Sequence, residues 1–469
     1  MTTTLVCGLG VSGAAAARVL LDRGDTVLLA DAGQPAARAA LEAAGARWLG
    51  GTAELPDGLD LVVTSPGWRP DSPLLVAAAA AGVEVIGEPE LAWRLRIAPA
   101  GGEPAPWYAV TGTNGKTTTV TMLEAVLTAA GRRAVAAGNV GRPLVEVVTA
   151  RDPDGMPSFD ALAVELSSFQ LHWSSTIAPA AAAVLNVADD HVDWHGSAEA
   201  YRDAKAKILE RTPVAVADAG DPVASSLVHA HRHPVTVTLE EPAPGQLGVR
   251  AGALVDRAFA DSPAGEVLVD TAALQVGGPH NTVNALVAAA LARVAGVDAA
   301  AIGRGLAGFR GGAHRNVLVA TVDGVDWVDD SKATNPHAAG ASLAGYPRVV
   351  WVAGGLLKGA DVDALVAAVA PRLAGVVLLG RDREQLARSL ARHAPAVPRT
   401  VVPSGDDAGV TSGTSGTAEQ VMTRVVQAAA RLARPGDTVL LAPAAASMDV
   451  FTDYAHRGRA FAEAVRALR

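Results

Sequence analysis

The sequence predicts a parallel α/β protein that is divided into three domains. Strand-like apolar runs alternate with alanine-rich helical stretches along nearly the whole chain, and this alternation is typical of parallel α/β architecture. The 469 residues exceed what one ordinary hydrophobic core accommodates, so two to four domains are expected. Two segments that break regular structure separate the strands into three series.

The first of these segments, residues 98–106, is rich in proline and glycine and can sustain neither a helix nor a central strand. The second, residues 309–313, ends a helix and precedes new strands. We therefore expect domains at residues 1–99, 100–311 and 312–469. Residues 404–417 are rich in Ser, Gly and Thr, and we expect a mobile surface loop there. The expected strands are residues 4–7, 26–30, 59–64, 107–110, 162–165, 181–186, 317–322, 325–329, 349–353, 375–379 and 438–441.

Composition argues against several classes of protein. The longest apolar stretches fall well below the roughly 20 residues that a membrane span requires, so we expect no membrane insertion. The N-terminus lacks the pattern of a signal peptide, and the cytoplasm is the expected location. The net charge of -9 contains no concentrated basic tract, which argues against a nucleic-acid partner. The single cysteine, Cys7, is expected to be a buried thiol without a chemical role.

A glycine-containing loop lies between the expected strand 107–110 and an expected helix over residues 119–130. Its residues are Gly112, Thr113, Asn114, Gly115, Lys116, Thr117 and Thr118. Glycines let backbone N–H groups converge on phosphate oxygens, the helix N-terminus adds partial positive charge, and a lysine can bridge the terminal phosphates. Thr117 would offer its hydroxyl to magnesium. Val110 replaces the first glycine of the full phosphate-loop pattern, so the loop is shortened at its front. The pattern predicts an enzyme that uses Mg-ATP; a chance glycine turn is the alternative.

Magnesium prefers oxygen ligands, so acids at the ends of the following strands are candidate ligands. Glu165 ends the strand 162–165 and is expected at the same sheet edge as the loop; a cap on the next turn is its alternative role. His191 follows the next strand, although a lone histidine in a loop is usually solvated or part of the core. Lys205 lies on an expected amphipathic helix over residues 201–208, where a lysine is ordinarily a surface charge.

The N-terminal glycines match the dinucleotide-binding fingerprint. Gly8, Gly10 and Gly13 follow the first strand, and Asp31 follows the second. Taken alone, this pattern predicts NAD binding. The same geometry can hold any diphosphate, so the fingerprint does not identify the nucleotide.

Several motifs together resemble those of the Mur ligase family, in the family's order. They are residues 111–118, 165–170, 190–191, 201–208, 280–285, 314–315 and 329–335. Residues 330–335 and 447–449 are similar to those of the member that adds D-glutamate to UDP-N-acetylmuramoyl-L-alanine. The resemblance covers nearly the whole chain. It implies a Rossmann-like N-terminal domain for the UDP moiety, a central P-loop ATPase-type α/β domain, and a Rossmann-like C-terminal domain for the incoming amino acid.

The resemblance also implies the reaction, an ATP-dependent ligation in cytoplasmic peptidoglycan precursor synthesis. ATP would phosphorylate the L-alanyl carboxylate, and the amine of D-glutamate would attack the acyl phosphate. A tetrahedral intermediate would then expel phosphate. We expect the chain to act as a monomer.

The same resemblance implies roles for residues of the central domain. Lys116 would neutralise phosphate charge, and Thr117 and Glu165 would hold the first of two magnesium ions. His191 would help to hold the second together with Lys205, carbamylated by carbon dioxide. Carbamylation requires that the lysine first loses its proton, which needs a pKa lowered by burial or by neighbouring cations. The resemblance also implies that Asn281 and Asn284, which share a helix face, contact ATP; their alternative role is to cap the helix. From the third domain, Arg315 would reach the transferring phosphate and Asp330 would contact the nucleotide.

The substrate contacts are likewise implied by the resemblance. For the uridine nucleotide they are Val11, Ser12, Asp31, Gly67 and Asn139. For D-glutamate they are Lys332, Thr334, Lys358, Ser447, Met448 and Tyr454. The chain departs from the family's pattern at residues 356–357, a Leu pair where Asp-Gly is expected, and at Tyr454, where Phe is expected.

Two alternative functions remain open. The first is another amino-acid-adding ligase or a folylpolyglutamate-type enzyme. Ligases for meso-diaminopimelate or L-lysine resemble Asp-Tyr-Ala-His in the third domain, whereas residues 329–335 here read Asp-Asp-Ser-Lys-Ala-Thr-Asn; we interpret the downstream Asp-Tyr-Ala-His at residues 453–456 as coincidental. The second is an NAD-dependent oxidoreductase with a regulatory ATPase, although no hydride-transfer constellation follows the glycine fingerprint.

Overall fold

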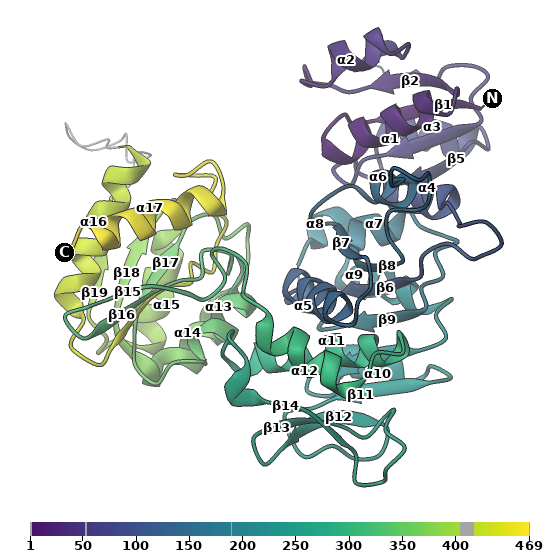
Figure 1. Ribbon diagram of the computed structural model, residues 1–469. Coiled ribbons are helices and arrows are strands. Elements are labelled where there is room, and N and C mark those ends of the chain that lie inside the picture. The colour runs from purple at the N-terminus through teal and green to yellow at the C-terminus, as the bar shows by residue number, and fades with distance from the viewer. Residues whose placement is uncertain (1, 52–53, 189, 404–416, 469) are drawn as a thin grey trace. The chain divides into compact units, whose positions relative to one another are not determined.

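The computed structural model describes residues 2–51, 54–188, 190–403 and 417–468, which form three sheets (Figure 1). The chain divides into two compact units. The first comprises Met1–Leu274 and Thr282–Phe309 and contains two of the sheets; the second comprises Gln275–Asn281 and Arg310–Arg469 and contains the third. The predicted loop at 404–417 falls, except for Thr417, outside the described residues.

The first sheet is parallel and has five strands in the order β3-β2-β1-β4-β5. Its strands are β1 (Thr3–Cys7), β2 (Thr26–Ala30), β3 (Arg47–Gly50), β4 (Leu61–Thr64) and β5 (Glu84–Gly87). The connecting helices are α1 (Val11–Asp22), α2 (Arg38–Ala43) and α3 (Pro73–Ala80), and α4 (Glu88–Leu95) leads to the second sheet. The strand order reverses beside β1, so the carboxyl ends of β1 and β4 form a switch point, where open α/β sheets bind ligands.

The second sheet has nine strands in the order β14-β13-β12-β11-β10-β9-β6-β8-β7. All neighbouring pairs from β12 to β7 are parallel, and β13 runs antiparallel to both of its neighbours. The strands are β6 (Trp107–Thr111), β7 (Ala134–Gly138), β8 (Ala161–Glu165), β9 (Ala181–Val184), β10 (Ala215–Asp218), β11 (Pro234–Val237), β12 (Gln246–Arg250), β13 (Ala253–Asp256) and β14 (Glu266–Asp270). The helices are α5 (Lys116–Ala129), α6 (Leu144–Thr149), α7 (Ser168–His172), α8 (Val192–His195), α9 (Ala198–Ala206), α10 (Pro222–His229), α11 (Pro279–Val294) and α12 (Ala299–Gly308).

One hydrophobic core connects the first two sheets. It contains Leu29 of β2, Leu91 of α4, Trp107 of β6 and Val145 of α6, all of which are buried. Because α4 contributes to this core and joins the two sheets in sequence, its position is fixed by burial of apolar surface on both sides.

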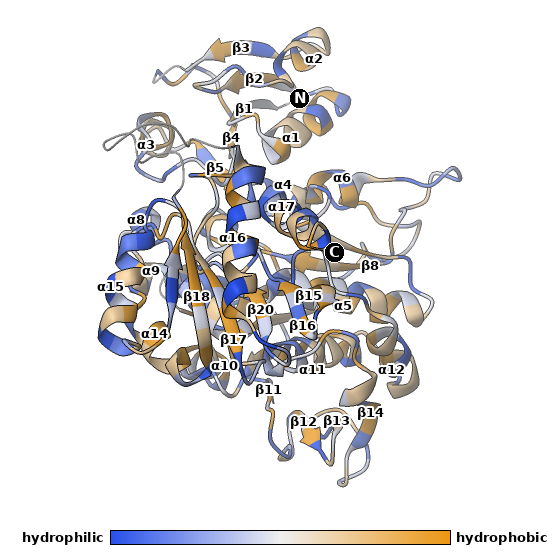
Figure 2. Cartoon of the chain, turned by 90° about the vertical axis from the view of Figure 1, so that its left-hand side faces the viewer, coloured by the Kyte–Doolittle hydropathy of each residue, from blue (hydrophilic) through white to orange (hydrophobic). Residues whose placement is uncertain are grey.

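The third sheet has six strands in the order β15-β16-β20-β17-β18-β19, and all pairs except β15 with β16 are parallel. The strands are β15 (Val317–Val322), β16 (Val325–Asp329), β17 (Val349–Gly354), β18 (Leu373–Leu379), β19 (Arg399–Val401) and β20 (Thr438–Leu441). The helices are α13 (Pro336–Leu343), α14 (Asp363–Val369), α15 (Arg383–His393), α16 (Ala418–Leu432) and α17 (Tyr454–Arg466). Two separate apolar clusters pack on this sheet, one with α13 to α15 and one with α16 and α17. Figure 2 shows the apolar colouring of β17 and β20 and the hydrophilic residues along α16.

The predicted parallel α/β architecture with three sheets is confirmed. The strand predicted at residues 59–64 begins two residues later, at Leu61, and the helix predicted over 119–130 begins earlier, at Lys116. Each sheet lies within one of the three predicted domain ranges, while the two compact units group the first two sheets together. Among the described residues, no helix is long and apolar enough to cross a membrane.

Burial of one carboxylate gives a testable pH dependence. Desolvation raises the pKa of Glu88 to about 7 from its usual value of 4.5. Between these two values the folded state holds a proton that the unfolded state has lost, so stability falls as pH rises from about 4.5 to 7. The loss of folding free energy over this whole pH range is on the order of 3 kcal/mol. We expect Glu88→Gln to flatten this part of the profile, measured by urea unfolding of both proteins at several pH values. Glu146→Gln, which alters a partly exposed acid in the first turn of α6, removes only the smallest contribution to this shift and should keep most of the slope.

Candidate functional site

The glycine loop predicted from the sequence connects β6 to the N-terminus of α5. Gly115 has φ +85°, and a Cβ atom there would lie 2.5 Å from Oδ1 of Asn284, so only glycine fits. The Nζ atom of Lys116 donates to the carbonyl oxygens of Gly112 at 2.8 Å and Thr113 at 3.0 Å. The lysine ammonium therefore lies over its own loop, beside the backbone N–H groups of the helix start.

Two residues that the sequence prediction did not assign fix this loop in place. Asn186, which follows β9, accepts from the N–H of Asn114 at 2.8 Å through Oδ1 and donates to its carbonyl oxygen at 3.1 Å. The hydroxyl of Tyr201 lies 3.1 Å from Oγ1 of Thr113. The only sequence signal for Asn186 is its place as the polar end of an apolar run. Tyr201 gives no such signal, because a tyrosine in an amphipathic helix usually packs in the core.

Glu165 is the last residue of β8 and is 2 % exposed. Its Oε2 accepts from the hydroxyl of Thr117 at 2.7 Å, and its Oε1 accepts from the amide of Asn139 at 2.8 Å. Gly138 has φ +107°, and a Cβ atom there would lie 2.3 Å from the carbonyl oxygen of Glu165. The structure thus brings together Thr117 and Glu165, as expected because the carboxyl ends of parallel strands lie at one edge of the sheet. It also places Asn139 on this carboxylate, which the sequence did not indicate.

Lys205 points into the protein from α9 and is 1 % exposed. Its Nζ atom donates to the carbonyl oxygen of Gly112 at 2.8 Å and lies 4.4 Å from the centre of the Tyr201 ring. Burial, and then the charge of Lys116, lower the pKa of Lys205 well below its usual range, while Asp190 and Glu165 oppose the shift. The ordinary reading of this lysine as a surface charge is wrong, because the helix packs this face against the phosphate loop.

His191 follows β9 in an exposed loop and has φ 53°. Its Nε2 lies 3.5 Å from Oδ2 of Asp190, and its ring centre lies 4.7 Å from that of Phe169. Next to it, Nε2 of His195 lies 3.0 Å from the hydroxyl of Ser168. Burial, followed by the charges of nearby histidines and Lys205, lowers the pKa of His195 to about 4. His195 is therefore neutral at physiological pH, and sequence reasoning did not single it out.

The two asparagines of α11 have different partners. Oδ1 of Asn284 accepts from the hydroxyl of Thr119 at 3.2 Å, which places it under the phosphate loop. Nδ2 of Asn281 donates to the carbonyl oxygen of Gly277 at 2.8 Å, at the start of the helix. Asn284 is thus brought to the loop, while the Asn281 amide donates to a carbonyl oxygen four residues earlier, which differs from the N–H-accepting bond of a helix N-cap.

The residues predicted to bind the uridine nucleotide lie at the switch point of the first sheet, apart from Asn139. Val11, 75 % exposed, and Ser12 begin α1, and Gly67 follows β4. The carboxylate of Asp31 accepts from the N–H of Leu9 at 2.7 Å and from that of Gly33 at 2.8 Å. Both oxygens of this acid are therefore bonded to backbone N–H groups of the surrounding turns.

The residues predicted to bind D-glutamate follow β16, β17 and β20 at the carboxyl edge of the third sheet. Nζ of Lys332 lies 4.0 Å from the centre of the Tyr454 ring, and the N–H of Thr334 donates to the carbonyl oxygen of Lys332 at 2.8 Å. Ser447 is buried, while Met448, 65 % exposed, and Lys358 face solvent.

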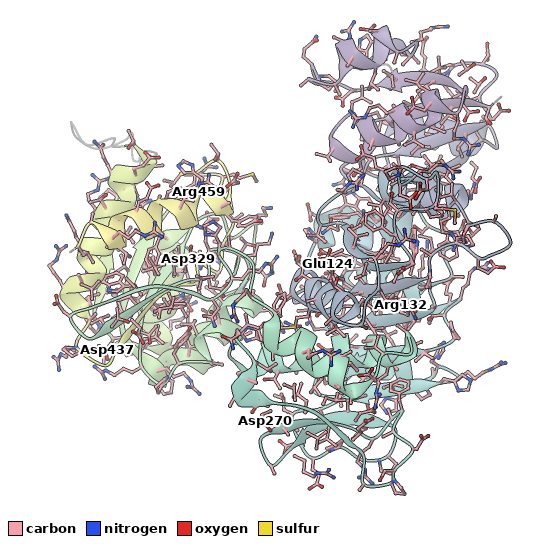
Figure 3. All side chains as sticks on the ribbon, viewed as in Figure 1. Glu124, Arg132, Asp270, Asp329, Asp437 and Arg459 are labelled. Atoms are coloured by element: carbon pink, nitrogen blue, oxygen red, sulfur yellow. The ribbon has the colours of Figure 1, made fainter. Side chains whose placement is uncertain are left out.

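Asp330 and Arg315 lie in the same compact unit. Burial raises the pKa of Asp330 to about 6, and the charge of Arg315 partly opposes this shift. Oδ2 of the neighbouring Asp329, labelled in Figure 3, lies 2.6 Å from Nδ1 of His314. Acidic and basic side chains thus gather at the end of β16.

The donor set beside the phosphate loop suits a hard cation. Among the described residues, no group of three or more His, Cys, Asp or Glu side chains could hold a metal on its own. Glu165 and Thr117 offer a carboxylate and a hydroxyl, which matches magnesium because that ion takes few protein ligands and completes its shell with phosphates and water.

Comparison with protein families gives one consistent result. Residues 2–87 match the Mur ligase MurD-like N-terminal domain, residues 110–292 match the Mur ligase middle domain, and residues 314–445 match the Mur ligase glutamate ligase domain.

Curated relatives agree over nearly the full chain. The UDP-N-acetylmuramoylalanine--D-glutamate ligase of Thermobifida fusca is 55 % identical over 474 residues, covering 99 % of this chain and 98 % of that protein. The protein of the same name from Streptomyces coelicolor is 51 % identical and covers 99 % and 97 %. That from Mycobacterium avium is 54 % identical and covers 87 % and 84 %.

Solved structures share the fold. UDP-N-acetylmuramate-alanine ligase MurC of Thermotoga maritima is 19 % identical with a TM-score of 0.57 and covers 100 % of both chains. The MurF ligase of the same organism, solved in complex with ADP, is 16 % identical with a TM-score of 0.56 and covers 95 % of this chain and 96 % of its own.

Proposed function

The chain belongs to the Mur ligase family, and we propose that it joins D-glutamate to UDP-N-acetylmuramoyl-L-alanine in the synthesis of peptidoglycan precursors, converting ATP to ADP and phosphate. The names of relatives that are 51 to 55 % identical over 99 % of the chain support this substrate pair. The observation that carries the chemistry is the convergence of Lys116, Glu165 and Lys205 on the phosphate loop.

The reaction needs ATP because a carboxylate is a poor electrophile. Transfer of the γ-phosphoryl group to the L-alanyl carboxylate forms an acyl phosphate and releases ADP. The amine of D-glutamate then attacks the acyl carbon, and the tetrahedral intermediate collapses with loss of phosphate and a proton. Positioning and electrostatic stabilisation supply most of the catalysis in phosphoryl transfer, so the backbone N–H groups of the loop and the ammonium of Lys116 act on the charge of the phosphates.

Magnesium, when bound, would neutralise charge on the phosphate oxygens. Thr117 and Glu165 would hold one ion, and His191 and Lys205 would help to hold a second. Lys205 suits this role only as a carbamate. Its buried amine, beside the charge of Lys116, favours the unprotonated form, which can add carbon dioxide and release a proton. The product replaces a cation by an anion.

The remaining assignments follow the family motifs. For the uridine nucleotide they are Val11, Ser12, Asp31, Gly67 and Asn139; for ATP they are Asn281, Asn284, Arg315 and Asp330; for D-glutamate they are Lys332, Thr334, Lys358, Ser447, Met448 and Tyr454. Two lysines suit the two carboxylates of D-glutamate, since charge-assisted hydrogen bonds to carboxylates are the strong ones. We propose a monomer that works in the cytoplasm.

The amino acid is tested by incubating the protein with Mg-ATP, UDP-N-acetylmuramoyl-L-alanine and one amino acid at a time. D-glutamate alone should stimulate phosphate release. L-glutamate, L-lysine and meso-diaminopimelate serve as controls. Stimulation by one of these in place of D-glutamate would assign the chain to another branch of the family.

The glycine fingerprint leads to a separate prediction about NADH. Asp31 of this fingerprint is assigned here to the uridine nucleotide, and no hydride-transfer constellation follows the fingerprint in the sequence. We expect no energy transfer from tryptophan to NADH when NADH is titrated into the protein. Saturable energy transfer that persists when UDP-N-acetylmuramoyl-L-alanine is added would favour a dinucleotide site.

A further inference from the structure

The first turn of α4 carries two buried carboxylates that bind segments of the second sheet. Oε2 of Glu90 accepts from the N–H groups of Ser175 and Thr176, both at 3.0 Å. Oε1 of Glu88 accepts from the N–H of Val145 at 2.7 Å. α4 therefore connects the first sheet to the segments that follow β7 and α7.

The two carboxylates differ in how completely they are bonded. Glu90 uses both oxygens, since its Oε1 accepts from the hydroxyl of Thr176 and from Arg94. Glu88 is 1 % exposed, yet its Oε2 has no hydrogen-bond partner among the described residues. A buried carboxylate with an unpaired oxygen lowers stability, so stability does not account for an acid at this position.

The backbone that Glu88 holds leads directly to the phosphate site. Val145 is the second residue of α6, and residues 139–143 connect that helix to β7. At the start of this loop, the N–H of Asn139 donates to the carbonyl oxygen of Glu165 at 2.9 Å, and its side chain donates to Oε1 of the same residue. The short loop is thus fixed by Glu165 at one end and by Glu88 at the other.

We propose that Glu88 is a positioning residue for the phosphate and magnesium site. By binding the N-terminus of α6, it holds residues 139–143 so that the amide of Asn139 keeps Oε1 of Glu165 occupied and turns Oε2 toward Thr117. A looser loop lets the Glu165 carboxylate rotate. The consequence for magnesium rests on the proposed function, whereas the ordering of the loop does not.

Two substitutions separate the hydrogen bond from the charge. Glu88→Met has a similar length and removes the acceptor, while Glu88→Gln keeps an acceptor oxygen without the charge. Glu146→Gln is the matched control, because Glu146 lies in the first turn of the same helix and pairs with Arg18 at the surface. All three are compared with the unmodified protein.

The first measurement is amide hydrogen exchange of the full chain without nucleotide or metal. Exchange over residues 139–145 should be about tenfold faster in Glu88→Met, less so in Glu88→Gln, and unchanged in Glu146→Gln. The second is the magnesium concentration for half-maximal phosphate release. This magnesium concentration should rise about tenfold in Glu88→Met, because loss of a contact that supports a metal ligand typically weakens metal binding by about that factor. KM for D-glutamate should stay constant.

The proposal would be overturned if the Glu88 variants that fold showed unchanged exchange over residues 139–145 and also an unchanged magnesium requirement. If Glu88→Met does not fold, Glu88→Gln decides by the same two readouts. A wild-type protein that D-glutamate does not stimulate would reject the proposed function alone, because the exchange measurement is made without substrate.

Discussion

Lys116→Ala is expected to lower D-glutamate-dependent phosphate release by on the order of 10³-fold, because catalysis of phosphoryl transfer depends on fixed charges at the phosphates. The ammonium of Lys116 lies over the loop, within hydrogen-bond distance of the Gly112 and Thr113 carbonyl oxygens. It can therefore turn to an incoming phosphate without any rearrangement of the backbone. The measurement is the rate of phosphate release at saturating substrates, with the variant's folding checked by circular dichroism.

Lys207→Ala is the matched control for this substitution. Lys207 follows α9 directly, and its Nζ atom donates to the carbonyl oxygen of His172 instead of a loop carbonyl. The control should keep most of the wild-type rate. Robust turnover by Lys116→Ala would contradict the role assigned to that lysine, because the variant lacks the principal cation of the loop.

Lys205→Ala should lose on the order of 10²-fold or more in rate and should regain part of it when a short carboxylate such as acetate is added. The substitution leaves a buried space beside the Gly112 carbonyl oxygen and the Tyr201 ring. An added carboxylate can supply there the negative charge that the carbamate supplies in the unmodified protein. The measurement is phosphate release as a function of acetate concentration.

Specificity of the rescue distinguishes a missing anion from general activation by salt. Acetate should not restore Lys116→Ala, since that variant lacks a cation, and chloride at equal ionic strength should not restore Lys205→Ala. Wild-type activity of Lys205→Ala without any additive would overturn the carbamate proposal.

The parts of the site that sequence predicted well are those set by local pattern. The loop before α5 follows from its glycines and its strand and helix flanks. The place of Glu165 beside it follows from parallel strands, whose carboxyl ends meet at one edge. Both inferences use only short segments and a general property of parallel sheets.

The parts that sequence did not predict depend on contacts between distant segments. Lys205 is assigned to the phosphate site only through the resemblance to family motifs, because an amphipathic pattern marks one face of its helix but does not say that this face meets Gly112, 93 residues earlier. The same limit applies to Asn139, which was assigned to the uridine nucleotide from motifs and lies on the Glu165 carboxylate. Glu88 gave no signal, because a glutamate near a helix start is ordinarily a surface residue that favours the helix dipole.

The central claim is that ATP binds with its phosphates against the backbone N–H groups at the start of α5. A crystal structure with magnesium and a non-hydrolysable ATP analogue tests it most directly. We predict the β- and γ-phosphates at residues 114–117, with Lys116 turned from the loop carbonyl oxygens to the phosphates and a magnesium ion on Thr117 and Glu165. A nucleotide bound elsewhere, with this loop unchanged and its Lys116 still on Gly112 and Thr113, would contradict it.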